Sequence, residues 1–365
     1  MNSSVKNLCD IIIPVWNNLD ITRDCIQSIN DNTRYPYRIV VIDNASDLKT
    51  KQYLNSLKND LQNQISIITN AKNLGFVKAV NQGLKFSDAK YMCIMNNDTI
   101  ATSGWLEEMV AIAEMDNLIG MVNPSSNTSC QFPGKMGIHE YAESLNRLKG
   151  TYQYLYTCRA FCMILKKEVK DRIGLLDENF GVGYFDDTDY CKRAQGYGYK
   201  TVRAKGSYVY HKESQSFAKI KKKDIIFSEN EKKFIRKWGL PLRVAYIIDG
   251  KSSDYKTVST YVNRVALMGY QAWLFTAGRV VAKLDTLDHD SIRFFIGNEL
   301  TLYPWALYKI AKRIKKKKIS VIIVNNKKKM NFLKKFSGLL KVEIFHDDEF
   351  DLACQKIKEL SLVKE

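Results

Sequence analysis

Short apolar runs alternate with amphipathic stretches over the first hundred residues. Four runs are typical of buried strands and end in Asn, Asp or small residues; they lie at 10–15, 37–43, 65–68 and 90–95. The apolar spacing between them predicts helices at about 21–30, 48–58 and 77–86. Strands that alternate with helices predict a parallel, doubly wound sheet. Because parallel strands end at one edge, we expect their polar ends to line one crevice, where such sheets bind ligands.

Further elements are predicted up to residue 240. In chain order these are a helix at 105–114, a loop-like region rich in Asn, Ser, Gly and Pro at 120–150, an apolar strand within 157–165, a glycine-containing loop at 174–185, a strand at 201–211 and a basic helix at about 224–238. Gly239-Leu240-Pro241 follows this helix, and such turn residues favour a domain boundary there.

The alternation restarts after residue 240. An amphipathic helix is expected at 257–268, and strands are predicted at 243–248, 271–275, 292–295, 319–324 and 342–345. The sequence therefore predicts an α/β domain at 1–240, built on a mostly parallel, Rossmann-like sheet, and a smaller α/β domain at 241–365.

Composition narrows the class of protein. Apolar residues make up 45% of the 365 positions and charged residues 26%, which is ordinary for a globular domain protein. No apolar run is long enough to cross a membrane, and the start lacks the pattern of a signal peptide. The eight cysteines form no CxxC pair, which favours reduced thiols over a disulfide framework or a zinc site. We expect a cytoplasmic protein.

Positive charge is concentrated in the predicted second domain. The net charge is +17, and residues 241–365 hold 23 Lys and Arg against 13 Asp and Glu. Eleven basic residues and no acid lie between Lys312 and Lys335. This segment is interpreted either as a surface for anionic lipid or nucleic acid, or as a solvated lysine-rich helix and loop. No nucleic-acid motif accompanies it, so a membrane surface, at the inner face of the plasma membrane, ranks above nucleic acid.

Candidate chemistry lies at the predicted strand ends. Asn96-Asn97-Asp98 follows an apolar strand and is, by itself, typical of a turn. Asp98 and His211 end neighbouring strands, where they can share Mg²⁺ or Mn²⁺ together with a diphosphate. A second carboxylate across the crevice, from the acids at 186–189, can then act as a general base on an alcohol. The alternative for these acids is a favourable charge at a helix N-terminus.

Five stretches carry a resemblance to a known family. They are Ile11-Ile12-Ile13-Pro14-Val15-Trp16-Asn17, Val40-Val41-Ile42-Asp43-Asn44-Ala45-Ser46-Asp47, Asn73-Leu74-Gly75-Phe76 with Asn81, Met95-Asn96-Asn97-Asp98-Thr99, and Leu176-Asp177-Glu178 with Phe185-Asp186-Asp187-Thr188-Asp189-Tyr190-Cys191-Lys192-Arg193. In this order and spacing, over about residues 8–240, they resemble family 2 glycosyltransferases of the rhamnosyltransferase-like, non-processive branch. The resemblance implies the GT-A fold, with the acceptor half built after residue 100.

The resemblance also implies a donor site at the first strands. Asp43 matches the carboxylate that accepts a hydrogen bond from the pyrimidine N3–H of the donor. The residues that would line or border the same nucleotide end are Pro14, Val15, Asn17, Asn73, Gly75 and Asn81.

The metal and catalytic positions follow from the same resemblance. Asn96-Asn97-Asp98 stands where the family has its DxD motif, so Asp98 would be the principal contact of Mg²⁺ or Mn²⁺, with Asn96 and Asn97 beside the donor. His211 matches a third metal or phosphate contact. Asp187 matches the catalytic base, with Asp186 in the place of the usual Glu and with Gly183 and Tyr184 on the acceptor side.

The function implied is an inverting, metal-dependent transfer of one sugar. The donor would be a UDP- or dTDP-sugar, and the acceptor a hydroxyl of a saccharide, lipid-linked, in cell-surface polysaccharide biosynthesis. The QxxRW motif of processive synthases is missing, which favours single transfer. The segment from 241 resembles the N-terminal half of GT-B glycosyltransferases without its nucleotide-binding half, which implies a non-catalytic accessory domain.

Two other interpretations remain open at this point, and a third is disfavoured. The first is a nucleotide-sugar-binding protein without turnover, and the second is a nucleic-acid-binding protein that uses the basic tail. The third, a sugar-1-phosphate nucleotidyltransferase, shares the strand–helix start but would need a Gly-rich, Arg-Lys loop after the first strand, which is missing.

Overall fold

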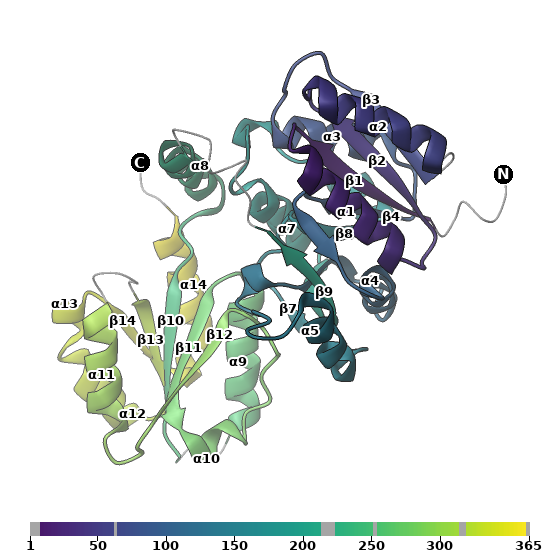
Figure 1. Ribbon diagram of the computed structural model, residues 1–365. Helices are drawn as coiled ribbons and strands as arrows, with labels where there is room; N and C mark the ends of the chain where they lie inside the picture. The colour runs from purple at the N-terminus through teal and green to yellow at the C-terminus, as the bar shows by residue number, and fades with distance from the viewer. Residues whose placement is uncertain (1–7, 62–63, 213–222, 251–253, 314–318, 363–365) are drawn as a thin grey trace. The chain divides into compact units, whose positions relative to one another are not determined.

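The computed structural model describes residues 8–61, 64–212, 223–250, 254–313 and 319–362 (Figure 1). It divides into two compact units, Met1–Glu231 and Lys232–Glu365. This division falls within helix α8 (Lys223–Trp238), whereas the boundary predicted from the sequence follows that helix. Each unit is described by itself below.

A mixed, mostly parallel sheet forms the centre of the first unit. Its strands, as far as the chain is described, are β1 (Cys9–Val15), β2 (Tyr37–Asp43), β3 (Ile65–Thr69), β4 (Tyr91–Met95), β5 (Thr99–Ala101), β6 (Ile119–Ser125), β7 (Tyr152–Tyr154), β8 (Cys162–Lys166) and β9 (Lys200–His211). They are ordered β3-β2-β1-β4-β8-β6-β9-β5, with β7 on β9. β1 to β4 are parallel, and β8 runs antiparallel between β4 and β6. The α/β class predicted from the alternation is confirmed.

Helices cover both faces of this sheet. They are α1 (Leu19–Asn32), α2 (Leu48–Leu61), α3 (Phe76–Phe86), α4 (Trp105–Glu114), α5 (Ile138–Ser144), α6 (Lys167–Ile173), α7 (Asp186–Gly196) and α8. Because side chains alternate along a strand, Ile11 and Ile13 of β1 pack in the core beneath α1, α2 and α4. Ile12 packs in the opposite core, beneath α3, α6 and α7. The strand ends are thereby held between two buried layers.

The prediction of a loop at residues 120–150 is wrong where the structure forms a strand and a helix. Residues Ile119–Ser125 form β6, a fully buried strand between β8 and β9, and Ile138–Ser144 form α5. The turn-forming residues within β6 each have a structural role. A side chain at Gly120 would come within 2.8 Å of Val169, and Pro124 lies where the register with β9 shifts. Asn123 hydrogen-bonds a neighbouring segment, as described below.

The second unit is a smaller, parallel sheet between helices. Its strands, within the described residues, are β10 (Arg243–Ile248), β11 (Gln271–Ala277), β12 (Ile292–Gly297), β13 (Ile319–Val324) and β14 (Glu343–His346), ordered β12-β11-β10-β13-β14. One core lies beneath α9 (Tyr255–Leu267), α10 (Gly278–Val281) and α14 (Phe350–Ser361). The other lies beneath α11 (Leu302–Arg313), α12 (Lys327–Lys334) and α13 (Ser337–Leu340). A second α/β unit was predicted, and it is present.

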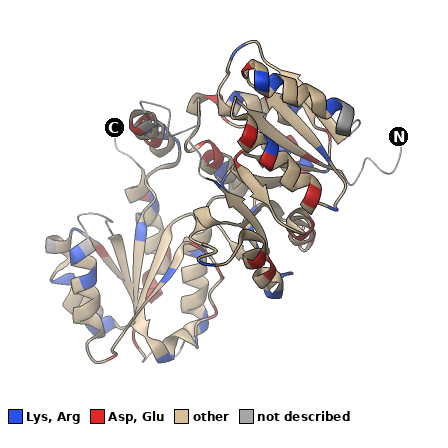
Figure 2. Cartoon of the chain, in the orientation of Figure 1, with Lys and Arg blue, Asp and Glu red and all other residues tan. Residues whose placement is uncertain are grey.

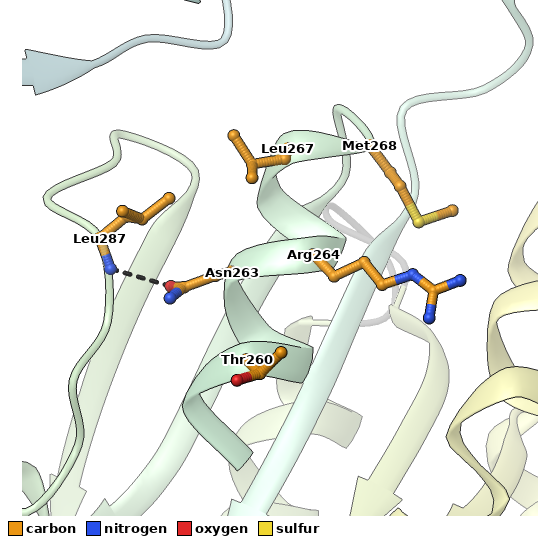
Figure 3. A pocket seen from close by; sticks show the side chains of 6 residues that line it. All are labelled: Thr260, Asn263, Arg264, Leu267, Met268 and Leu287. Atoms are coloured by element: carbon orange, nitrogen blue, oxygen red, sulfur yellow. Dashed lines mark hydrogen bonds between the residues drawn. The ribbon is translucent and has the colours of Figure 1, made fainter. Parts of the chain in front are cut away.

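A shallow hollow of about 470 Å³ lies on α9 of the second unit (Figure 3). Leu267, Met268 and Leu287 give it apolar walls, and Asn263 accepts a hydrogen bond from the Leu287 N–H at 2.8 Å. None of the candidate site residues lines it.

The sequence predicted no membrane-spanning helix and no disulfide bonds. None of the helices in the described part combines the length and apolar composition that a membrane span needs. The cysteines are free thiols, and Cys130 is the exposed one.

Candidate active site

The ends of β1 and β2 lie side by side and are joined by hydrogen bonds. Val15 is in register with Asp43, the last residue of β2. The backbone N–H of Asn17 donates to the Ser46 hydroxyl at 3.0 Å, and the Asn17 side-chain oxygen accepts from the Asp47 N–H at 2.7 Å. Asn17 has a φ of 58°, in the left-handed region, which turns the chain sharply out of the strand. Pro14, Val15, Asn17 and Asp43 therefore form one cluster.

Asp43 offers an acceptor inside this cluster. It is 2% exposed, and one carboxylate oxygen accepts from the Ser46 N–H at 2.9 Å. Among the described residues, the second oxygen has no hydrogen-bond partner. A carboxylate oxygen without a protein donor keeps its acceptor capacity. This oxygen can therefore accept a hydrogen bond from a ligand such as a nucleobase N–H.

Asn44 organises the loop that carries Asn73 and Gly75. Its amide donates to the Asn73 side-chain oxygen at 2.8 Å and its oxygen accepts from the Leu74 N–H at 2.9 Å. Asn73 also accepts the Gly75 N–H at 2.8 Å. Gly75 has a φ of 82°, and a side chain there would lie 3.5 Å from Val182. The loop of Asn73 and Gly75 thus lies against the loop that precedes α7.

Asp98 and His211 come together as predicted for neighbouring strand ends. β5 pairs with β9, with Thr99 opposite His211, and this places an Asp98 carboxylate oxygen 3.0 Å from His211 Nε2. The Asn96 amide nitrogen lies 3.4 Å from the same ring nitrogen. Asn127 fixes the His211 backbone, since it accepts the N–H and donates to the carbonyl, both at 2.8 Å. The other ring nitrogen, Nδ1, is buried and has no hydrogen-bond partner.

This pair fits a divalent cation. Two ligand atoms that are each about 2.1 Å from an octahedral ion, at a right angle, lie about 3.0 Å apart. The Asp98–His211 distance is 3.0 Å, and Asp98 is 7% exposed. A carboxylate suits Mg²⁺ and Mn²⁺, and neutral imidazole is the commonest metal ligand. The geometry and the donor atoms are therefore compatible with the predicted metal.

Asp186 and Asp187 begin α7, as the pattern predicted. One Asp187 oxygen accepts from the Thr188 N–H at 2.7 Å, and the other accepts from the Ala160 N–H at 3.3 Å. Burial raises the pKa of Asp187 above its usual value, against these hydrogen bonds, which lower it. Burial, and then the charge of Asp187, raise the pKa of Asp186 to about 8. Such shifts are typical of functional carboxyl groups.

The third acid has a structural role. Asp189 is fully buried and pairs with Arg193 at 2.9 Å. The Arg193 guanidinium also donates to the carbonyls of Ile173 and Leu175 at 2.6 and 2.7 Å. This network ties α7 to the end of α6 and leaves Asp186 and Asp187 as the candidate reactive pair.

The loop before α7 is strained and is held by α8. Tyr184 and Phe185 have φ values of 68° and 67°, which non-glycine residues adopt at a cost in energy. Their rings lie 5.4 and 5.2 Å from the ring of Phe227 on α8. Asn230 of the same helix donates to the Gly183 carbonyl at 2.8 Å. The predicted acceptor-side residues thus depend on a helix that sequence reasoning did not connect with them.

A segment that was not predicted to matter, residues 158–162, touches both reactive groups. Besides the Ala160 N–H bond to Asp187, the Phe161 ring stacks on His211 with 5.2 Å between ring centres. The Phe161 carbonyl accepts the Asn96 N–H at 2.8 Å. The sequence here has no periodicity or motif that could have revealed this arrangement.

Two predicted donor residues use their amides inside the fold. Asn81 is 2% exposed, and it donates to the Leu176 carbonyl and accepts the Leu176 N–H, both at 3.0 Å. Asn97 donates to the Thr22 hydroxyl of α1 at 2.9 Å. The structure thus gives both side chains partners within the protein, and direct donor contact by either stays a prediction.

The family model for glycosyl transferase family 2 matches residues 10–172. The first unit belongs to glycosyl transferase family 2. An uncharacterized glycosyltransferase of Haemophilus influenzae is 32% identical over 112 residues, 31% of this chain and 34% of that protein. The uncharacterized protein y4gI of Sinorhizobium fredii is 25% identical over 232 residues, 57% of this chain and 25% of that protein. The chain thus spans about a quarter to a third of the length of these two relatives.

Two solved structures are similar to this chain at a lower level. A mannosyltransferase of Pyrobaculum calidifontis, solved with GDP-Man and Mn²⁺, has a TM-score of 0.46 and 16% identity, covering 57% of each chain. GalNAc-T7, solved with UDP, GalNAc and Mn²⁺, has a TM-score of 0.47 and 14% identity, covering 56% of this chain and 44% of that one.

The family match confirms the family predicted from the motifs, and the rhamnosyltransferase-like branch stays a prediction. The matched residues run from β1 to α6 and include Asp43 and Asp98. They end before Asp187 and His211, whose placement is given by the geometry of α7 and of the β5–β9 pair.

Proposed function

We propose that this family 2 protein transfers a single hexosyl group from a nucleotide-diphospho-sugar to a hydroxyl of a saccharide acceptor. The observation that carries the proposal is the joint placement of two reactive centres. Asp98 and His211 form a pair at the strand ends, and segment 158–162 contacts both His211 and Asp187. A cation site together with a half-buried carboxylate suits the attack of an alcohol on a sugar that carries a diphosphate leaving group.

The donor nucleotide is proposed to bind at the ends of β1 and β2. The unpartnered oxygen of Asp43 would accept the N3–H of a pyrimidine, which favours UDP- or dTDP-sugars. Pro14, Val15 and Asn17 surround this carboxylate, and the loop of Asn73 and Gly75 borders it. The motif pattern also supports membership of the rhamnosyltransferase-like branch of the family.

Asp98 and His211 are proposed to hold Mg²⁺ or Mn²⁺. The bound cation would neutralise the nucleoside diphosphate as a leaving group. One nitrogen and one oxygen ligand favour Mn²⁺ over Mg²⁺, which prefers oxygen alone. Asn96 lies beside the same ring nitrogen and orients it.

Asp187 is proposed as the general base. It would take the proton from the acceptor hydroxyl while that oxygen attacks the anomeric carbon opposite the leaving group, which inverts the configuration. Its hydrogen bonds with Ala160 and Thr188 hold the carboxylate in one orientation. The raised pKa makes it a stronger base than an exposed aspartate.

A thermal-shift panel followed by product analysis tests this function. UDP-, dTDP- and GDP-sugars are each added with Mn²⁺, and the best donor is then incubated with saccharide acceptors. We expect a pyrimidine nucleotide-sugar to raise Tm, and a product whose anomeric configuration by NMR is inverted. Donor binding without any transfer would instead favour a nucleotide-sugar-binding protein without turnover, and a retained configuration would overturn the inverting mechanism.

We also propose that the second unit brings the enzyme to a lipid-linked acceptor, at the inner face of the plasma membrane, in cell-surface polysaccharide synthesis. The support is its charge. No acid occurs between Glu299 and Glu343, and this stretch contains α11 and α12, which pack on one face of the sheet (Figure 2). Residues 314–318, within the predicted Lys312–Lys335 segment, lie outside the described residues.

Exposed aromatic side chains accompany the lysines on this helical face. Tyr308, Phe332 and Phe336 are 60%, 46% and 36% exposed. In the described part of the chain, Lys312, Lys327, Lys328 and Lys334 take part in no ion pair. On the opposite face the charges are balanced by pairs such as Arg264–Asp351. Lysines mixed with aromatic residues on a helix surface are typical of contact with anionic lipid.

A further inference from the structure

Segment 158–162 is the physical connection between the two proposed reactive centres. Its Ala160 N–H donates to Asp187, and its Phe161 ring stacks on His211. The segment is also fastened to α7 at a second point, since the Cys158 N–H lies 3.1 Å from Cys191 Sγ. A shift of this segment would therefore change the surroundings of both centres at once.

A buried side chain on the neighbouring strand holds this segment from behind. Asn123 of β6 is 4% exposed. Its side-chain oxygen accepts the Arg159 N–H at 2.6 Å, and its amide donates to the Arg159 and Cys162 carbonyls at 2.9 and 2.5 Å. One amide side chain thus meets three backbone groups on both sides of Ala160 and Phe161, although it contacts neither Asp187 nor His211.

We propose that Asn123 is a positioning residue: it clamps segment 158–162 so that the Ala160 N–H stays aimed at Asp187 and the Phe161 ring stays stacked on His211. The inference rests on the proposed function for its catalytic consequence. Only the amide groups of Asn and Gln combine a carbonyl acceptor with an NH₂ that can donate twice, and the length of Asn fits these three partners. This explains why an amide residue lies in this buried strand, directly after the apolar residues Met121 and Val122.

Loss of the clamp should act on the base through one hydrogen bond. The Ala160 N–H stabilises the ionised form of Asp187, as do Thr188 and the positive charge of Arg159, whereas the Asp186 carboxyl next to it opposes that charge. If Ala160 moves away, the pKa of Asp187 rises further. Asn123→Ala should therefore move the acidic limb of the kcat profile to higher pH and lower kcat about tenfold to a hundredfold, as small misplacements in active sites do.

Loss of the clamp should also weaken the metal pair. Without the Phe161 ring against it, the His211 imidazole can rotate away from Asp98. Mn²⁺ affinity, measured by electron paramagnetic resonance of the free ion, should fall at least about threefold in Asn123→Ala. This readout needs neither donor nor acceptor. It therefore distinguishes failure of the clamp from failure of the proposed sugar transfer.

Ser125→Ala is the matched control. Ser125 is buried on the same strand, and its hydroxyl donates to the Lys205 carbonyl at 3.2 Å, away from segment 158–162. Asn123→Ser is a milder second variant, which keeps one hydroxyl for the Arg159 backbone and guards against a variant that does not fold. Circular dichroism and thermal unfolding report whether each protein is folded.

The expected result is a shifted acidic limb and weaker Mn²⁺ binding in both Asn123 variants, larger in the alanine, with neither change in Ser125→Ala. If folded Asn123→Ser and Asn123→Ala keep the pH profile and the Mn²⁺ affinity of the control, Asn123 has only a structural role and the proposal is wrong. If the wild-type protein binds Mn²⁺ but transfers no sugar from any donor, the proposed function fails, and the Mn²⁺ comparison still decides on the clamp.

Discussion

At the scale of single residues, the sequence identified chemical groups but not their surroundings. Asp98 and His211 were singled out because they end predicted strands, and the fold brings them to 3.0 Å. Asp187 was singled out by the acid cluster at 186–189 and by the family resemblance. The segments around these groups are held by asparagines, namely Asn44, Asn123, Asn127 and Asn230. Asparagine is common in loops and turns for many reasons. Its presence alone therefore could not indicate which backbone groups each one would bind.

The neighbouring carboxyl groups of Asp186 and Asp187 predict that the stability of the protein depends on pH. The native pKa of Asp186 is raised to about 8 from its ordinary value, so the native state holds a proton that the unfolded state has lost. The stability that comes from neutral Asp186 is present at pH 4 and is lost as the pH rises to 8. Asp186→Asn, always neutral, should exceed the wild-type Tm by a margin that grows from pH 4 to pH 9, reaching at least about 2–4 °C, or about 1 kcal/mol.

Asp88→Asn serves as the control for this measurement, since the Asp88 side chain is 93% exposed. Its Tm difference from wild type should stay flat over the same pH range. A flat difference for Asp186→Asn as well would show that Asp186 is not protonated in the native protein.

The pair of Asp98 and His211 predicts that Mn²⁺ affinity falls when either side chain is removed. Asp98→Ala and His211→Ala should each weaken Mn²⁺ binding by at least about tenfold, because each removes one of two protein ligands. Isothermal titration with Mn²⁺ measures this directly. Asp20→Ala, whose side chain is 87% exposed on α1, should bind as the wild type does. Unchanged affinity in both ligand variants would place the metal elsewhere.

At the scale of elements, periodic patterns predicted well and irregular segments did not. The helix predicted at 105–114 coincides with α4, and the strands β1 to β4 lie where the apolar runs predicted them. β6 was missed because Gly120, Asn123 and Pro124 are turn formers in general. Gly120 allows close packing, Asn123 hydrogen-bonds a neighbouring segment, and Pro124 lies at a shift of register. These roles depend on the tertiary structure and have no local signal in the sequence.

The dependence of the acceptor-side loop on α8 predicts a specific effect. Asn230→Ala removes a donor to the Phe180 and Gly183 carbonyls, which lie at 2.7 and 2.8 Å. Leaving buried carbonyls unpaired should cost about 1–3 kcal/mol of stability. Since the strained loop loses its support, KM for the acceptor should rise more than KM for the donor.

Steady-state kinetics with varied acceptor and varied donor measure this difference, and thermal unfolding measures the stability. Asn55→Ala, exposed on α2, is the matched control and should change neither. Equal changes in both KM values would mean that α8 supports the whole site rather than the acceptor side.

At the scale of the whole molecule, the sequence predicted two α/β parts, and both are present. Charge, in contrast, became interpretable only with the fold. A run of lysines along the chain can be spread around a domain, but here the acid-free stretch covers one face of the second sheet through α11 and α12. The second unit therefore has one basic face and one face with paired charges.

This asymmetry predicts selective binding to anionic vesicles. Lys328→Glu with Lys334→Glu should weaken binding to vesicles that contain anionic lipid, measured by co-flotation, by at least about thirtyfold. Each lysine near such a surface contributes about 1 kcal/mol, and each new glutamate is repelled by it. Lys256→Glu with Lys358→Glu changes the same charge on the α9 and α14 side and should bind nearly as the wild type. Equal losses in both variants, or salt-dependent binding to RNA in place of vesicles, would contradict a lipid-facing surface.

Asp187 carries the chemistry of the proposed transfer. Asp187→Asn keeps the size of the side chain and removes its basicity, so product formation from the best donor should fall at least about a hundredfold. The Tm increase caused by the nucleotide with Mn²⁺ should persist, since Asp43, Asp98 and His211 are unchanged. Asp171→Asn, half-exposed on α6, should transfer at the wild-type rate. Transfer by Asp187→Asn at the wild-type rate would contradict the assignment of Asp187 as the base.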